Sequence, residues 1–245
     1  MNYIIGDIHS SVDKLNLILS LLHLKSNDTL IFLGDYIDKN THTQETVARL
    51  KQLQKNYTCI FIKGNHDFVW ERYLLYGETD RQDYLLRYGG VETLKQFHDH
   101  PKELIQRNDI TKIKKYLSDY IALIHTMRDY HIVGPYLALH AGLTKDQYNQ
   151  DPLKFTEKNY FLRPHDIHLD KCYLDKYMLV AGHTFLNESP MKSKGYINLD
   201  LGAGYDKYLA VLCVEQKIIF RSDGEKFYLD DIPEFRHDSL NFIYE

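Results

Sequence analysis

Five short apolar runs, each followed by a polar motif that contains glycine or histidine, constrain the fold of this 245-residue chain most strongly. Each run has four or five residues rich in Ile, Leu, Val, Phe or Tyr, which is typical of a buried strand. The motifs that follow the runs are Gly6-Asp7-Ile8-His9, Gly34-Asp35-Tyr36-Ile37-Asp38, Gly64-Asn65-His66-Asp67, His140-Ala141-Gly142 and Gly182-His183. The pattern predicts a sheet whose strand ends gather polar side chains.

Segments with helical periodicity separate the first three runs. Residues 12–24 and 43–57 each place apolar side chains on one side of a helix. Strands and helices that alternate at a spacing of about 30 residues predict right-handed crossovers and a parallel sheet. In such a sheet the polar strand ends emerge along one edge, where open α/β sheets bind ligands.

A long region without comparable strands follows the third motif. Its helix-like segments are residues 68–76, 91–98 and 110–124. Because no Pro/Gly/Ser-rich linker marks its ends, we predict a single domain over residues 1–245 with a helical insertion over about 68–130.

Three further apolar runs follow His183. They comprise residues 196–201, 209–214 and 217–221. Their spacing resembles a β meander, which could form a second sheet.

Composition and charge limit the class of protein. With 44% apolar and 26% charged residues, the chain is typical of a globular protein that can bury a core. The net charge of -4 and the shortness of the basic stretch around Lys112 argue against a nucleic-acid partner. The first residues do not read as a signal peptide, and the longest apolar stretch is too short to span a bilayer. Three widely spaced cysteines suggest no disulfide framework. Together these features lead us to expect a cytoplasmic protein with no membrane partner. No sequence feature specifies an oligomeric state.

Six residues at the strand ends can bind metal ions: Asp7, His9, Asp35, Asn65, His140 and His183. They supply carboxylate, amide and imidazole ligands and no sulfur, a mixture that suits divalent Mn, Fe or Zn. Six ligands exceed the needs of one ion with an open position, whereas two ions about 3.5 to 4 Å apart could share Asp35 and divide the others. The sequence therefore predicts a site for two divalent metal ions, with manganese as the first candidate and iron and zinc as alternatives.

Such a pair of ions suits the hydrolysis of phosphoesters. It can hold a hydroxide at neutral pH and neutralise the phosphoryl oxygens during in-line displacement. His66 lies next to Asn65 on the same loop and is placed to protonate a leaving alkoxide. Asp38 could hold that imidazole in the correct tautomer. We therefore predict that His66 and Asp38 are catalytic residues.

The five motifs resemble, in order, the signature of the calcineurin-like metallophosphoesterases. Within that superfamily the chain is most similar to the serine/threonine phosphoprotein phosphatase branch, which includes small bacterial and phage enzymes. The similarity spans residues 1–214 and includes Tyr88-Gly89-Gly90 and residues 198–203. It implies an α/β fold, a four-layer α-β-β-α sandwich of two mixed sheets with metals at the strand ends. The implied substrate is a phosphorylated protein or a small phosphoester.

The resemblance also implies a role for each residue of the site. The first metal would be bound by Asp7, His9 and Asp35. The second would be bound by Asp35, Asn65, His140 and His183. His66 would be the general acid, paired with Asp38.

Two arginines usually hold the phosphate in this branch, and one of them has a counterpart here. Arg163, between the last two histidine motifs, matches the second arginine. Lys39 stands where the first is usual, so a point charge replaces a bidentate guanidinium. Ser10 and Asp67 also replace a usual Gly and Glu, whereas all metal ligands are kept.

Alternative functions remain open from the sequence. The missing arginine at position 39 motivates hydrolysis of dinucleoside polyphosphates such as diadenosine tetraphosphate. A non-catalytic interaction module, from another class, would be expected to lose ligands, and none is missing. A nuclease is disfavoured by the acidic charge and the absence of a basic stripe.

Overall fold

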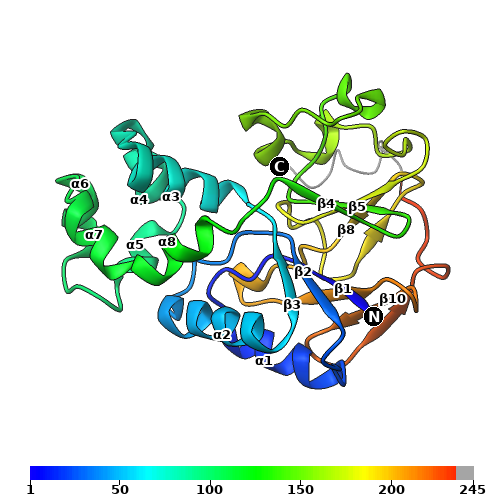
Figure 1. Ribbon diagram of the computed structural model, residues 1–245, viewed down its shortest axis with the longest axis horizontal. Helices are drawn as coiled ribbons and strands as arrows, with labels where there is room; N and C mark the ends of the chain where they lie inside the picture. The colour runs from blue at the N-terminus through cyan, green and yellow to red at the C-terminus, as the bar shows by residue number, and fades with distance from the viewer. Residues whose placement is uncertain (236–245) are drawn as a thin grey trace.

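The computed structural model describes residues 1–235, so the last ten residues of the predicted domain lie outside it. Its strands form two mixed sheets that pack face to face, and helices cover the outer face of the first (Figure 1). The predicted α/β class with two mixed sheets is confirmed.

The first sheet has six strands in the order β11-β10-β9-β1-β2-β3. Its strands are β1 (Asn2–Ile5), β2 (Thr29–Phe32), β3 (Thr58–Phe61), β9 (Ala210–Cys213), β10 (Ile218–Arg221) and β11 (Lys226–Tyr228). β1, β2 and β3 run parallel, as the alternation predicts, and α1 (Val12–Leu21) and α2 (Thr43–Asn56) are the crossovers. The first three motifs therefore meet at one edge of this sheet.

The second sheet has five strands in the order β4-β5-β6-β8-β7. Its strands are β4 (Tyr130–Val133), β5 (Tyr136–Leu139), β6 (Met178–Ala181), β7 (Met191–Lys192) and β8 (Tyr196–Asn198). β5, β6 and β8 are parallel, whereas β4 and β7 pair antiparallel at the two edges. Parallel pairing of β5 and β6 places the two histidine motifs that follow them side by side.

Alternation along β1 divides its side chains between two cores. Tyr3 and Ile5 belong to the core formed with the helices, whereas Ile4 faces the second sheet. Ile4 lies beside Ile31 of β2, which lies beside Ile60 of β3. One apolar row of the first sheet thus packs against the second sheet.

We expect Ile4→Ala to lower the free energy of unfolding by about 2–5 kcal/mol, because the truncation leaves a cavity between the sheets. Leu17→Ala is the control, since Leu17 is 57% exposed on α1; its effect should stay within about 0.5 kcal/mol. Urea denaturation measures both variants. Equal destabilisation of the two would contradict the place of Ile4 in the core between the sheets.

The strands after His183 do not form the predicted meander in a second sheet. β8 joins β6 in the second sheet, whereas β9 and β10 join the first, with β9 antiparallel to β1. The physical reason is the free edge of β1, whose backbone groups need a partner once β2 occupies the other edge. The chain therefore changes sheets between β8 and β9.

The outer face of the second sheet is covered by loops and short 3-10 helices. The 3-10 helices of this layer are Gln147–Asn149, Glu157–Tyr160 and Pro164–Asp166. Leu139 and Leu179 of the sheet pack there with Tyr148 and Leu169 of the covering segment. The predicted four layers are present, and the fourth is built of short turns instead of α-helices.

A helical segment follows β3 and lies beside the two sheets (Figure 1). Its helices are α3 (Asn65–Tyr76), α4 (Gln82–Arg87), α5 (Gly90–Leu94), α6 (Pro101–Gln106), α7 (Ile110–Tyr116) and α8 (Ser118–Ile124). α3 begins at Asn65, earlier than predicted, so the third motif forms its first turn. The helix predicted over residues 110–124 is two helices, which meet at Leu117. Within residues 1–235 no helix combines the length and apolar character that a bilayer crossing requires.

Candidate active site

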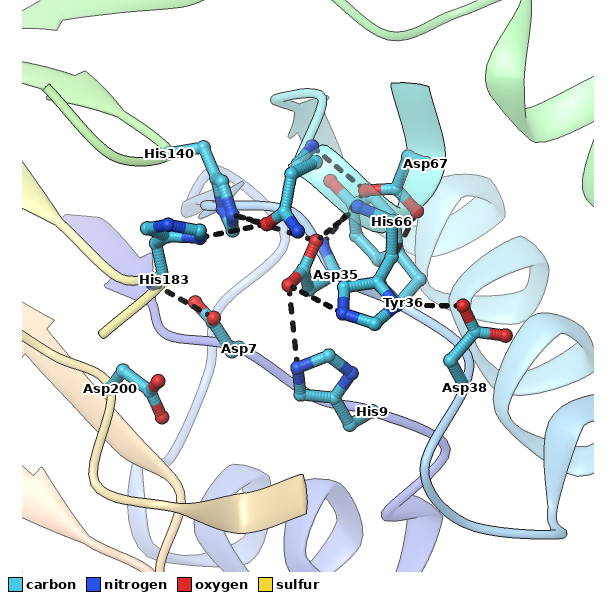
Figure 2. A network of polar contacts seen from close by, with 12 residues as sticks. Asp7, His9, Asp35, Tyr36, Asp38, His66, Asp67, His140, His183 and Asp200 are labelled. Atoms are coloured by element: carbon cyan, nitrogen blue, oxygen red, sulfur yellow. Dashed lines mark hydrogen bonds and ion pairs between the residues drawn. The ribbon is translucent and has the colours of Figure 1, made fainter. Parts of the chain in front are cut away.

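The candidate site lies where the strands of the two sheets end (Figure 2). The structure brings together all six predicted metal ligands: Asp7, His9, Asp35, Asn65, His140 and His183. Five of them are buried and His183 is partly exposed. They converge because each follows a parallel strand, or begins the helix after one, at the same end of the two packed sheets.

Asp35 lies between two groups of imidazoles (Figure 2). Its Oδ2 is 3.3 Å from His9 Nε2, and its Oδ1 is 3.5 Å from His140 Nε2. Two groups of side chains with metal-binding geometry share this carboxylate: one adds His9 and His66, and the other adds His140 and His183. A carboxylate shared between two ligand groups is what two neighbouring ions require.

The Asn65 amide oxygen faces two imidazoles. His140 Nδ1 is 2.9 Å from the Leu33 carbonyl oxygen, so Nδ1 carries the proton and donates. His140 Nε2 then presents a lone pair to Asn65 Oδ1 at 2.7 Å. His183 Nδ1 lies 2.8 Å from the same oxygen. Two acceptor atoms this close repel one another unless a cation binds both, so this arrangement fits a metal ligand set.

Three polar atoms at the site are buried without a hydrogen-bond partner among the described residues: Asp7 Oδ1, His9 Nε2 and His183 Nε2. Asp7 Oδ2 accepts from the His183 backbone N–H at 2.9 Å, which leaves Oδ1 without a donor. His9 Nδ1 is 3.0 Å from the Ile37 carbonyl, and this contact leaves Nε2 as the free nitrogen. Unpaired buried groups of this kind are costly, and divalent cations would satisfy them.

Burial and neighbouring charge shift the pKa values of the site. Burial, with repulsion from Asp200 and Asp35, raises the pKa of Asp7 well above its ordinary value. Burial lowers the pKa of His9 to about 4 and that of His183 well below its usual range. Neutral imidazoles beside crowded carboxylates are suited to bind cations.

His66 is held by Asp38 and points its other nitrogen into the site. Its Nδ1 is 2.7 Å from Asp38 Oδ2, and its Nε2 is 3.9 Å from Asp35 Oδ2. Trp70 Nε1 and the Thr93 hydroxyl donate to Asp38 Oδ1 at 2.9 and 2.6 Å. Burial lowers the pKa of His66, but attraction by Asp35 and Asp38 outweighs it and raises the pKa above its ordinary value. An oriented, protonated imidazole can deliver a proton from Nε2.

The loops that carry the site adopt a left-handed backbone at several non-glycine residues. The residues with positive φ angles, 46° to 72°, are His9, Ser10, Asp35, Asp38, Lys39 and His183. Such conformations cost about 1–3 kcal/mol each and persist where the surrounding structure imposes them.

Two glycines of the motifs make room for carboxylates. A Cβ at Gly64 would lie 2.1 Å from Asp35 Oδ1, and one at Gly182 would lie 1.8 Å from Asp7 Oδ1. Any side chain at either position would displace a candidate ligand. These glycines are therefore part of the site, although neither contributes a functional group.

Two buried acids without a predicted role lie beside the ligands. Asp67 accepts from the backbone N–H groups of Asp35 and Gly64 at 2.7 and 2.8 Å, and the Tyr120 hydroxyl donates to it at 2.5 Å. Asp67 thus supports the loop of the shared carboxylate. Asp200 follows β8 and lies near Asp7 (Figure 2). Polar residues that follow parallel strands form the candidate site, and Asp200 follows β8. The same rule would have identified Asp200 if β8 had been expected to pair with β6.

A pocket of about 280 Å³ opens onto these residues. Its lining includes Asp35, Lys39, Asn65, His66, Tyr84, Tyr88, Phe161, Arg163, His183 and Tyr205. Arg163 Nη1 is 3.4 Å from the Thr184 hydroxyl oxygen, and Lys39 Nζ is 4.3 Å from the centre of the Tyr205 ring. The two cations that the sequence predicts to bind phosphate therefore line the same pocket as the metal ligands.

Comparison with known proteins agrees with this geometry. The family model for calcineurin-like phosphoesterases matches residues 3–206. A Schizosaccharomyces pombe protein described as a candidate serine/threonine-protein phosphatase is 30% identical over 100 residues, which are 39% of this chain and 31% of that protein. The matched part thus spans about a third of the length of that curated relative.

Two solved structures share the fold. A cold-active protein tyrosine phosphatase has a TM-score of 0.60 at 18% identity, with 98% of this chain and 80% of that chain covered. A candidate diadenosine tetraphosphatase has a TM-score of 0.54 at 18% identity, with 90% of this chain and 91% of that chain covered. At these identities the likeness concerns the fold alone.

Proposed function

The chain belongs to the calcineurin-like phosphoesterase family, and from this premise we propose that it is a serine/threonine protein-phosphatase-like phosphomonoesterase. Family membership makes it a phosphoester hydrolase. The observation that carries the proposed hydrolysis is the convergence of two ligand groups on Asp35, beside a histidine oriented by Asp38. The match to a serine/threonine-phosphatase relative supports a phosphorylated protein as the substrate class.

In the proposed mechanism the ligands divide between two divalent ions, for which we propose manganese. Asp7, His9 and Asp35 would hold the first. Asp35, Asn65, His140 and His183 would hold the second. When bound, the two ions would activate water and neutralise the phosphoryl oxygens.

The other residues of the pocket bind the substrate and deliver a proton. His66 gives the proton on Nε2 to the leaving oxygen, while Asp38 holds Nδ1 and so keeps the ring in position. Arg163 and Lys39 bind the remaining phosphoryl oxygens from the pocket wall. The non-catalytic alternative is not supported, since His66, Arg163 and Lys39 line the pocket and Asp38 contacts His66.

His66 also has the geometry of a ligand in the group with His9 and Asp35. We assign it as the acid because a ligating imidazole must be neutral, whereas the Asp38 carboxylate at 2.7 Å from Nδ1 favours the charged form of His66. Its Nδ1 is also engaged by Asp38, as a proton donor needs for orientation.

Hydrolysis of dinucleoside polyphosphates is the second candidate. Tyr88 and Tyr205 line the pocket with side chains that are 51% and 57% exposed, and exposed aromatic rings can stack on nucleobases. Lys39 in place of an arginine favours the same alternative, because a lysine contacts a polyphosphate chain as a point charge.

A substrate panel separates the two candidates. With Mn²⁺ added, we expect kcat/KM for a phosphoserine or phosphothreonine peptide to exceed that for diadenosine tetraphosphate by at least about tenfold, or about 1.4 kcal/mol of transition-state stabilisation. Chelation with EDTA should abolish activity, and Mn²⁺ should restore it. Absence of activity on every phosphoester with Mn²⁺ restored would exclude the proposed function. A preference for diadenosine tetraphosphate would establish the second candidate instead.

We also propose a cytoplasmic location and no stable nucleic-acid partner. The three cysteines are free, as is usual in a reducing compartment. The net charge of -4 disfavours binding to a phosphate backbone.

A further inference from the structure

We propose that Tyr84 is a positioning residue that holds the Asn65 side chain in its metal-binding orientation. The inference rests on the proposed function, because it requires Asn65 to be a metal ligand. Tyr84 belongs to α4 of the helical segment and lines the pocket over the site. It would give α4, which carries none of the predicted ligands, a part in forming the metal site.

The chemistry of the amide group decides which atom of Asn65 can bind a cation. Asparagine binds a cation through Oδ1, because the Nδ2 lone pair is delocalised into the carbonyl. Asn65 Oδ1 faces His140 Nε2 at 2.7 Å and His183 Nδ1 at 2.8 Å. The opposite end of the amide, Nδ2, donates a hydrogen bond to the Tyr84 hydroxyl. With Oδ1 directed at the ions, Tyr84 is thus the acceptor that satisfies the amide nitrogen.

The Tyr84 ring is held by its neighbours, so the position of its hydroxyl is set before a metal binds. Its centroid lies 4.6 Å from that of Tyr88, and its ring meets Phe161 edge-on at 6.2 Å and His66 edge-on at 5.4 Å. Leu85, the next residue of α4, is buried in the core of the helical segment. Asn65 is itself buried. A buried amide nitrogen without its acceptor would be left unpaired whenever Oδ1 binds a metal.

Tyr84→Phe tests the inference, because it removes the hydroxyl and keeps the ring. Isothermal titration of the metal-free protein with Mn²⁺ alone measures both affinities without a substrate. We expect the affinity of one of the two ions to fall about 10- to 100-fold, as is typical when the partner of a metal ligand is removed. The other affinity should change little. Unchanged binding of both ions would overturn the inference and leave the proposed function standing.

Tyr88→Phe is the matched control. It removes a hydroxyl from the neighbouring ring of the same pocket, and no hydrogen bond joins Tyr88 to Asn65 within residues 1–235. We expect both Mn²⁺ affinities to remain as in the parent chain. An equal loss in this control would show that the tyrosines act through packing of the pocket, which would overturn the inference.

Testing Tyr84→Phe in the Asn65→Asp variant shows whether Tyr84 acts by orienting the Asn65 amide or by packing in the pocket. Asn65→Asp offers a metal-binding oxygen in either orientation and has no amide N–H to satisfy. Adding Tyr84→Phe to Asn65→Asp should therefore reduce Mn²⁺ affinity much less than it does in the parent chain. An equal reduction in both backgrounds would overturn the inference. A parent chain that binds no Mn²⁺ would remove the proposed function, and this inference with it.

Discussion

Asp35→Asn is expected to lower kcat/KM by at least about a thousandfold and to release one or both metal ions. The reason is that the pair of ions would supply several kcal/mol of charge stabilisation in the transition state. One Asp35 oxygen faces His9 and the other faces His140. An amide would remove the negative charge from between two cations and turn one ligand oxygen into a donor. One of the two ligand groups would then lack its shared member.

Metal content per chain and the rate on p-nitrophenyl phosphate, measured on the same preparation, check this result. Asp119→Asn is the matched control, because the Asp119 side chain is 68% exposed and pairs with Lys51 in solvent. Both quantities should be unchanged in the control. Full activity of Asp35→Asn with two bound ions would contradict the shared ligand.

His66→Asn should reduce kcat about 10²- to 10⁴-fold, the usual cost of losing a general acid, without reducing metal content. Asp38 orients the His66 imidazole through its contact with Nδ1, and Nε2 faces the pocket. Asparagine fills part of the same space but cannot deliver a proton to a leaving alkoxide. The loss should therefore fall on the chemical step and leave the metal site intact.

The leaving group provides an internal check on this role. p-Nitrophenolate leaves without full protonation, so the loss in His66→Asn should be smaller on p-nitrophenyl phosphate than on a phosphoserine peptide. His125→Asn, at the exposed end of α8, is the matched control and should behave as the parent chain. If metal content falls in His66→Asn, His66 is a ligand in the group with His9 and Asp35, and its assignment as the acid is wrong.

Several residues of the candidate site were accessible from the sequence through one local rule. Asp7, His9 and Asp35 follow short apolar runs, and alternating helices predict that those runs are parallel neighbours. Parallel neighbours end at the same edge, so their following residues must meet. The confirmed pairing of β1 with β2 and of β2 with β3 bears out this step.

The strands after His183 show where local rules fail. The apolar character of residues 209–214 predicts a strand in either sheet. It does not specify which neighbouring strand they pair with. The open edge of β1 decides the partner of β9, and that edge exists only once the first sheet has formed. Asp200 was missed for the same reason, since its place near Asp7 depends on β8 pairing with β6.

The sequence by itself determined the types of the candidate ligands, their order and the parallel strands that gather them. Each of these follows from residue identity and from periodicity within a few dozen residues. Tertiary structure decided which oxygen of Asp35 faces which imidazole, and that Tyr84 of α4 reaches Asn65 at the start of α3. Asn65 and His183 are 118 positions apart, yet their side chains meet at 2.8 Å. Contacts of that kind depend on the packing of two sheets against each other, for which no stretch of sequence carries a local signal.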